Sequence, residues 1–220
     1  MNIKIDALNY YGATKKYHLH FPALREDIEA DVVIIGGGFS GINTALELAE
    51  QGITNVVVLE ARHLGYGGTG RNGGQVLTDI ACGMDSVRAQ LGADAAHAIW
   101  DMSVEAVHLV GERCARYQID ADLRWGYFHA ALKPRQMHEL AGWQARAAQD
   151  YGYSAYRLVE QEEVASLVAS PRYIGGLYDP GCGQLHPLKY ALGLAAAAVK
   201  AGVRVYEHSP ALRIQIGRAH

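Results

Sequence analysis

Two glycine-rich segments carry residues whose types and spacing could bind a nucleotide. In the first, IIGGGFSG, Gly36, Gly38 and Gly41 form the spacing GxGxxG, with Phe39 and Ser40 between the last two glycines. The first glycine of this motif permits a tight turn, the second lets the backbone approach a pyrophosphate, and the third lets a helix pack closely on a strand. The amide groups at the start of that helix would point at phosphate oxygens. The spacing therefore predicts a dinucleotide site.

An acidic residue stands where a ribose contact requires one. Glu60 directly follows the apolar run Asn55–Leu59, about 20 residues after the last motif glycine. A carboxylate at this position can accept hydrogen bonds from ribose hydroxyls and would repel a 2′-phosphate. A glycine turn that binds nothing is the alternative. The order of strand, glycine turn, helix, strand and carboxylate favours the dinucleotide.

The second segment, GYGGTGRNGGQ, spans residues 65–75 and sets Arg71 and Asn72 between paired glycines. Its glycines would let main chain run against a ligand, while Arg71 and Asn72 offer donors to phosphate or ring oxygens. A flexible surface loop is the alternative. A nicotinamide cofactor has no evident use for a second glycine-rich loop, whereas the longer FAD molecule would extend along it. The segment therefore favours FAD.

The flanking sequence predicts the elements that hold both segments. Short β-branched runs at Asp31–Ile35 and Asn55–Leu59 predict buried parallel strands, and the periodicity of Ser40–Gln51 predicts a helix between them. Such a βαβ crossover unit takes about 30 residues. An N-terminal stretch without regular structure is expected before it. Further helices are expected at 94–117, with Asp94 as N-cap, at 134–151 and at 187–200, and strands at 123–132, 156–159, 173–178 and 203–207.

These elements predict an α/β fold, with a Rossmann-like FAD-binding βαβ domain and part of an inserted α+β substrate domain. The expected divisions are an arm (1–30), the βαβ unit with the glycine-rich loop (31–82), an insertion on the substrate side (83–180), a returning helix and strand (181–214) and a non-native tail (215–220). The tail IGRAH can be encoded by ATCGGAAGAGCACAC, which matches a common sequencing adapter. Native sequence is therefore expected to end near Ile214, truncating the fold.

Composition argues against several classes of protein. The net charge of -3 gives no sign of a nucleic-acid surface, no apolar run approaches the roughly 20 residues of a membrane span, and the N-terminus lacks the apolar core of a signal peptide. Cys82, Cys114 and Cys182 are widely spaced and read as reduced thiols of a cytoplasmic protein. No HExxH motif or Cys/His cluster appears, and His18 with His20 alone makes a poor site, so no metal is predicted.

Three segments together resemble FAD-dependent oxidoreductases of the D-amino-acid-oxidase type: DVVIIGGGFSGINTALELAEQG, VVVLEARHLGYGGTGRNGGQ and GCGQLHPLKYALGLAAAAVKAGVRVYEHS. The resemblance implies that one set of residues binds the ADP half of FAD, namely Gly36, Gly38, Gly41 and Glu60, with the neighbours Phe39, Ser40, Ala61 and Arg62 also at the cofactor. It implies that a second set lines the pyrophosphate, ribityl and flavin side, namely Thr69, Arg71, Asn72, Gly73, Gly74 and Gln75. Ala211 stands where the family usually has a valine whose backbone meets the adenine.

The same resemblance implies oxidation of an amine C–N bond. Hydride passes from the carbon bearing the amine to flavin N5, the imine hydrolyses, and oxygen or another acceptor reoxidises the flavin. The cofactor carries the difficult step, so no nucleophile–base pair is required. His186, in QLHPL, is the candidate for a residue near the flavin; the alternative is that it only starts the following helix. No cysteine or histidine stands at an obvious attachment point, so FAD is expected to be non-covalent.

The resemblance implies γ-glutamylputrescine as the small-molecule substrate, with sarcosine, glycine or another small amine as alternatives. A non-catalytic flavin-binding fragment, or a subunit completed by another chain, also stays open, and an NAD-dependent dehydrogenase is the most distant alternative. Because the family continues beyond the length of this chain, the 220-residue polypeptide alone is expected to be inactive.

Overall fold

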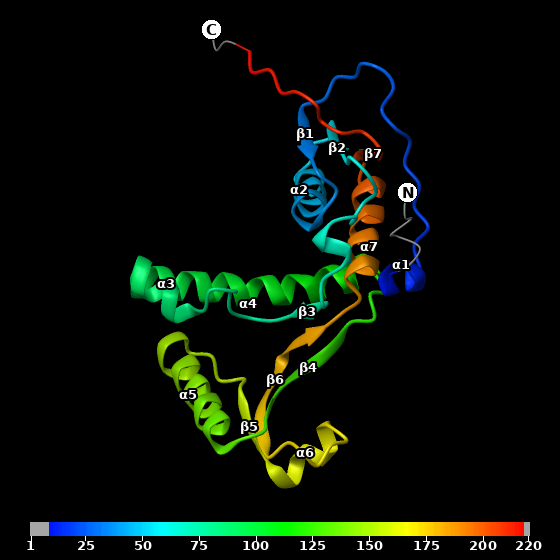
Figure 1. The fold of residues 1–220 in the computed structure, drawn as a ribbon. Coiled ribbons are helices and arrows are strands. Elements are labelled where there is room, and N and C mark those ends of the chain that lie inside the picture. The colour runs from blue at the N-terminus through cyan, green and yellow to red at the C-terminus, as the bar shows by residue number, and fades with distance from the viewer. Residues whose placement is uncertain (1–8, 218–220) are drawn as a thin grey trace. The chain divides into compact units, whose positions relative to one another are not determined.

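A computed structural model describes residues 9–217 of the chain, which form two compact units (Figure 1). The first unit takes in residues 1–74, 113–122 and 186–220, and the second takes in 75–112 and 123–185. These divisions fall at other residues than the expected ranges, because the chain leaves the first unit, returns for ten residues and leaves again. Residues 1–8 of the expected arm and 218–220 of the expected tail lie outside the described residues.

The first unit contains a three-stranded parallel sheet. Its strands are β1 (Val32–Ile35), β2 (Val56–Leu59) and β7 (Arg204–Tyr206), in the order β1-β2-β7. The central strand is paired on both sides, and its three valines are at most 1% exposed. A run of β-branched residues without polar alternation is what a strand covered on both faces requires. The two predicted strands of the βαβ unit are confirmed.

Two helices accompany this sheet. Helix α2 (Phe39–Glu50) connects β1 to β2, and helix α7 (Pro187–Lys200) precedes β7 and packs against α2 (Figure 1). The buried side of α2 carries Ile42, Ala45 and Leu46, as its helical periodicity predicts. The predicted α/β architecture, with a βαβ unit around the first glycine-rich turn, is confirmed.

A short helix, α1 (Tyr10–Thr14), lies in the stretch that the sequence led us to expect without regular structure. It begins because the side chain of Asn9 accepts a hydrogen bond from the backbone of Gly12 at 2.8 Å. This is the N-cap contact that asparagine makes well. The ring of Tyr11 meets the His186 ring edge-on, with centroids 5.0 Å apart. The expectation was wrong here because the capping signal occupies a single residue.

The second unit is built on an antiparallel sheet. Its strands are β3 (Gln75–Val76), β4 (Arg124–Ala131), β5 (Arg157–Glu160) and β6 (Gly175–Gln184). Strand β6 pairs with β3, β4 and β5, so it is the axis of the sheet. The sequence predicted only residues 173–178 for it, since DPGCG reads as a turn. Pairing with β4 carries the strand on to Gln184 through a register shift, in which residues 180–182 of β6 lie opposite Gly126 of β4.

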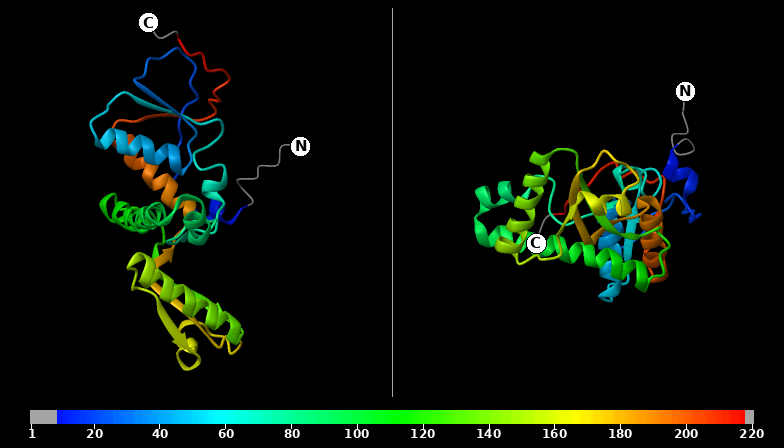
Figure 2. Two further views of the ribbon diagram at one scale, coloured as in Figure 1. Left: turned by 90° about the vertical axis from the view of Figure 1, so that its left-hand side faces the viewer. Right: turned by 90° about the horizontal axis from the view of Figure 1, so that it is seen from below.

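The helices that follow β3 in the chain and precede β6 are α3 (Met84–Leu91), α4 (Ala93–Arg116), α5 (Pro134–Tyr151) and α6 (Gln161–Leu167). Of these, α5 and α6 pack against the sheet. Helix α5 packs along β4, β5 and β6 (Figure 2, left) through a cluster centred on Ala131, Leu140 and Leu177. Asp94 lies within the first turn of α4 and is therefore not its N-cap, which corrects the expectation. In the first turn the negative charge of Asp94 still interacts favourably with the helix dipole and stabilises α4.

All three cysteines are free thiols, with Cys82 exposed and Cys114 and Cys182 buried. Burial raises the pKa of the Cys114 thiol to about 11, and burial together with a hydrogen bond to Asp179 does the same for Cys182. Both buried thiols therefore stay protonated and inert at neutral pH. Among the described residues, no helix combines the length and apolar character needed to cross a membrane.

The last residues of α4 belong to the first unit and are fixed to α2 by a buried guanidinium. Arg113 is 6% exposed. Its Nη2 lies 2.9 Å from Glu47 Oε2, and its Nη1 donates to the side-chain oxygen of Asn43. A planar guanidinium suits this fork because it donates to two acceptors at once. The contact joins the C-terminal end of α4 to the helix that follows the glycine turn.

We predict that Arg113→Ala lowers the free energy of unfolding by about 1–3 kcal/mol, because the buried stem and both hydrogen bonds are lost. Urea unfolding followed by circular dichroism measures this. Arg135→Ala is the matched control, since Arg135 pairs with Glu139 on the surface of α5 with its side chain 86% exposed. That variant should lose less than about 0.5 kcal/mol. Equal losses in both variants would contradict the assignment.

Candidate functional site

The first glycine turn is built so that only glycine fits at two of its positions. Gly36 has a φ of +104°, in the region that side chains disfavour, and its N–H donates to Leu59 O at 2.8 Å. A Cβ on Gly41 would lie 2.0 Å from the Gly36 carbonyl oxygen and 3.1 Å from the side chain of Ile34. The close packing of helix on strand expected from Gly41 is thus present, and the turn brings α2 directly over the end of β1.

Glu60 connects this turn to the segment after β2. Its carboxylate is partly buried, with Oε2 accepting from the Gly37 N–H at 2.8 Å and Oε1 accepting from the Arg62 N–H at 2.7 Å. Its own carbonyl accepts from Ser209 N at 2.9 Å. Each carboxylate oxygen can accept more than one hydrogen bond. Glu60 can therefore hold the turn and still accept from the hydroxyl groups of a ligand.

Thr69 joins the two glycine-rich segments. The N-cap of helix α2 is Gly38, which has no side chain to accept from the first amide groups of the helix. Thr69 supplies an acceptor instead, because the N–H of Phe39 donates to Thr69 Oγ1 at 3.1 Å. A Cβ on Gly38 would lie only 3.0 Å from the same oxygen. The structure therefore brings both predicted segments together. The hydroxyl of Thr69 and the first amide groups of α2 form one polar surface.

The second segment is held by its own asparagine. A short 3₁₀ turn, η2 (Gly68–Gly70), is followed by Asn72, whose Nδ2 donates to Gly68 O at 3.1 Å and Thr69 O at 2.8 Å. Its Oδ1 accepts from Gly74 N at 2.8 Å. Here Asn72 shapes the loop, whereas the sequence suggested it as a donor to the cofactor. Its contact with a cofactor stays a prediction.

Two arginines flank a tyrosine that the sequence analysis did not single out. The guanidinium carbons of Arg62 and Arg71 lie 4.8 Å and 4.4 Å from the ring centroid of Tyr66. Cation–π contacts at these distances hold exposed arginine side chains in place. The structure thus gathers two positive charges beside the glycine turns, where a pyrophosphate would profit from them. The sequence signal that could have singled out Tyr66 is the presence of an aromatic residue within the glycine-rich segment 65–75.

Other predicted residues are not brought to this surface by contacts within the first unit. Ala61 and Gly73 lie in exposed loop positions, as does Ala211, which follows β7. Gln75 belongs to the second unit, where its Nε2 donates to the Tyr127 hydroxyl at 2.6 Å. Ser40 lies exposed in the first turn of α2. Their roles at a cofactor stay predictions.

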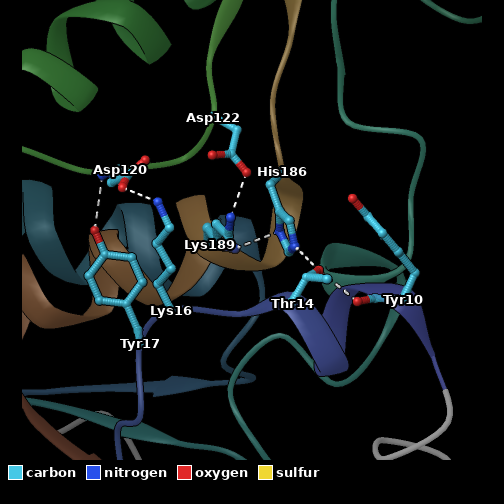
Figure 3. A network of polar contacts seen from close by, with 8 residues as sticks. All are labelled: Tyr10, Thr14, Lys16, Tyr17, Asp120, Asp122, His186 and Lys189. Atoms are coloured by element: carbon cyan, nitrogen blue, oxygen red, sulfur yellow. Dashed lines mark hydrogen bonds and ion pairs between the residues drawn. The ribbon is translucent and has the colours of Figure 1, made fainter.

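His186 is the N-cap of α7 and is 6% exposed. Its Nδ1 accepts from Lys189 N at 3.2 Å, so the neutral ring carries its proton on Nε2, which lies 2.9 Å from the Thr14 hydroxyl (Figure 3). That hydroxyl in turn donates to Tyr10 O at 2.7 Å. Burial, followed by the charge of Lys189, lowers the pKa of His186 and keeps it neutral. These contacts favour the alternative that His186 starts the helix.

Ion pairs around His186 fix the N-terminal arm. Lys189 is buried and its Nζ lies 2.5 Å from Asp122 Oδ2, a hydrogen bond that lowers the pKa of Asp122 (Figure 3). Lys16 of the arm pairs with Asp120, whose backbone N–H donates to the Tyr17 hydroxyl at 3.1 Å. Both contacts hold the arm against the first unit. The cluster pairs every charge that it buries, and it therefore reads as structural.

The second unit contains a cavity of about 760 Å³, lined by polar and apolar side chains, that the sequence analysis did not anticipate. Burial raises the pKa of Tyr156 in its wall to about 12 and lowers the pKa of His129. Asp179, also in the wall, is 1% exposed and accepts from the Tyr153 hydroxyl at 2.8 Å and from Gly181 N at 2.8 Å. The sequence signal that could have indicated this cavity was Asp179, the acidic residue in the glycine-rich sequence of β6.

Comparison with known proteins agrees with the geometry of the first unit. The family described as "FAD dependent oxidoreductase" (DAO) matches residues 31–220. A probable oxidoreductase OrdL of Haemophilus influenzae is 40% identical over 92% of this chain, and the γ-glutamylputrescine oxidoreductase of Escherichia coli is 39% identical over 94%. The chain spans about half the length of these relatives, 47% and 48%.

Solved structures show the same fold. An L-amino acid deaminase from Proteus myxofaciens superposes with a TM-score of 0.70 at 24% identity, covering 87% of this chain and 41% of that one. A glycine oxidase from Bacillus cereus superposes with a TM-score of 0.63 at 21% identity, covering 86% and 50%. At these identities the likeness concerns the fold alone. With the family match over residues 31–220, the chain belongs to the DAO family of FAD-dependent oxidoreductases.

Proposed function

We propose that the protein binds FAD non-covalently through the first unit and oxidises an amine C–N bond. The observation that carries this proposal is the position of the Glu60 carboxylate, held by the amide groups of Gly37 and Arg62 at the end of β2. A carboxylate there would accept from the ribose hydroxyls of a dinucleotide whose pyrophosphate lies at the GxGxxG turn. The family match supports the same cofactor.

We assign residues of the first unit to the parts of the ADP half. The left-handed turn at Gly36 and the absence of side chains at Gly38 and Gly41 let main chain line the turn, since a Cβ on Gly41 would meet the Gly36 carbonyl and one on Gly38 would crowd Thr69. The amide groups at the start of α2 would donate to the pyrophosphate, with Arg62 and Arg71 adding positive charge. Residues 61–62 and 211 would lie at the adenosine.

When bound, FAD supplies the two-electron oxidation of the carbon that carries the nitrogen. The protein has to bind the uncharged amine, orient that carbon and exclude water. The second segment, residues 65–75, would provide main chain along the cofactor. Asn72 keeps this loop in shape by bonding to its backbone on both sides. A small amine would be the substrate, and oxygen or another acceptor would take up the electrons.

Within this chemistry we propose γ-glutamylputrescine as substrate, in keeping with the name of the Escherichia coli relative that is 39% identical over most of this chain. Because the chain spans 48% of that relative, the substrate assignment concerns the full gene product. Three free cysteines are consistent with a reducing compartment, and we place the reaction in the cytoplasm.

We predict that Glu60→Ala weakens FAD binding about 10- to 100-fold, because it removes charge-assisted hydrogen bonds worth about 1.5–3 kcal/mol. Quenching of flavin fluorescence on titration measures the dissociation constant. Glu105→Ala, which removes an exposed carboxylate from α4 in the second unit, is the matched control and should bind FAD like the parent protein. Unchanged binding by the Glu60 variant would show that the ribose contact has been misassigned.

We predict that the flavin is released on denaturation. None of the residues placed at the cofactor is a cysteine or histidine, so the structure offers the cofactor no attachment point among them. Precipitation with acid should leave all flavin absorbance in the supernatant. Yellow colour in the washed pellet would refute a non-covalent cofactor.

We predict peroxide release when the full gene product, from its natural start to its natural stop, is supplied with γ-glutamylputrescine. Putrescine, sarcosine and glycine are tested separately, and each should give a kcat/KM at least about tenfold lower, since binding energy from the glutamyl part is absent. A preference for sarcosine or glycine would reject the substrate and leave the flavin oxidase in place. Reduction of the flavin without peroxide would point to another electron acceptor.

A further inference from the structure

Two histidines and a glutamate converge beside the sheet of the first unit. His63 lies in the segment after β2, while Glu207 and His208 directly follow β7. One ligand atom from each side chain can be chosen so that all three lie within 4.8 Å of one another. We propose that these side chains bind one divalent transition-metal ion, with Zn²⁺ as the ion to be tested. The proposal does not depend on the proposed oxidation of amines.

Glu207 is the fixed member of the group. Its side chain is 9% exposed, and its Oε1 accepts from the backbone N–H of Leu64 at 2.8 Å. Its Oε2 lies 3.7 Å from His63 Nδ1. One carboxylate oxygen is therefore held by the backbone while the other faces a histidine. An outer hydrogen bond of this kind orients the carboxylate ligands of known metal sites.

His208 is held in place by its backbone. It has a φ of +51°, a left-handed conformation that few non-glycine residues adopt, and its N–H donates to Arg62 O at 3.0 Å. The His63 and His208 rings meet edge to face, with centroids 4.6 Å apart and planes at 86°. Two imidazoles thus stand beside one buried carboxylate.

This donor set suits a transition metal. Zn²⁺ binds imidazole nitrogen and carboxylate oxygen at about 2.0–2.2 Å, so its ligand atoms lie roughly 3.3–3.5 Å apart. The separation between His63 Nδ1 and Glu207 Oε2 is 3.7 Å and all three ligand atoms lie within 4.8 Å of one another, so the side chains would have to close on the ion. The side chain of His63 is 50% exposed, which leaves it room for this movement. Imidazoles favour Zn²⁺ over Mg²⁺, which takes oxygen ligands. Three protein ligands leave the fourth position to water.

A bound ion would connect two segments that also position Glu60. Hydrogen bonds already join residues 60–64 to the end of β7, among them those from Leu64 N to Glu207 and from His208 N to Arg62 O. A metal bridge from His63 to Glu207 and His208 would add a further connection. It would therefore stabilise the folded protein in proportion to the logarithm of the free metal concentration.

The test is equilibrium dialysis of the metal-free protein against Zn²⁺ without FAD, so that its result is independent of cofactor binding. We expect one Zn²⁺ per chain, a rise in melting temperature with Zn²⁺, and neither effect with Mg²⁺. His63→Ala and His208→Ala should each weaken Zn²⁺ binding at least about tenfold, as should Glu207→Gln. His138→Ala, at an exposed histidine of α5, is the matched control and should bind like the parent protein.

Because His63 and His208 are both exposed, their variants should fold, and circular dichroism verifies this. The proposal is overturned if the parent protein takes up no stoichiometric Zn²⁺. It is equally overturned if both folded histidine variants bind Zn²⁺ as tightly as the parent, since the ion would then lie elsewhere. Co²⁺, which reports its ligand geometry by absorption, should show a band in the parent that is lost in His208→Ala.

Discussion

The hydrogen bonds of the Glu60 carboxylate are the contacts on which the first unit depends. Strands β1 and β2 end side by side, and each is followed by a backbone turn whose amide groups need partners. One carboxylate satisfies Gly37 from the first turn and Arg62 from the second. The sharp glycine turn and the start of α2 are thereby fixed relative to the segment after β2. A single acidic residue sets the shape of the edge at which a nucleotide would lie.

The glycines around this edge matter because they carry no side chain. A Cβ at Gly41 would collide with the backbone of the turn, and one at Gly38 would press on Thr69. With no side chains there, the Thr69 hydroxyl reaches the Phe39 N–H and joins the second glycine-rich segment to the first. The two segments form a continuous surface of main chain and donors, which an extended cofactor can follow.

Sequence predicted those features that are local and repeat along the chain. The βαβ unit, helices α5 and α7 and the approximate strands of the second unit follow from periodicity and capping. It missed α1, whose signal is Asn9 alone, and the length of β6, which depends on pairing with strands distant in sequence. The convergence of His63 with His208 could not be predicted either, because only the parallel pairing of β2 with β7 creates it.

The strand order β1-β2-β7 explains why the candidate cofactor and metal residues lie around the segment that follows β2. As the central strand, β2 has neighbours on both sides, so the segment that follows it can bond to both adjoining loops. Glu60 reaches toward the turn after β1, while Leu64 is reached by Glu207 from the end of β7. The oxygens of the Glu60 carboxylate keep lone pairs that can accept further hydrogen bonds. Oε2 of Glu207 is not used by Leu64 and lies beside the two histidines. Residues 60–64 would thus offer the Glu60 carboxylate to a nucleotide, and they also hold the Glu207 carboxylate beside two histidines, because parallel strands bring their carboxyl ends to a common edge.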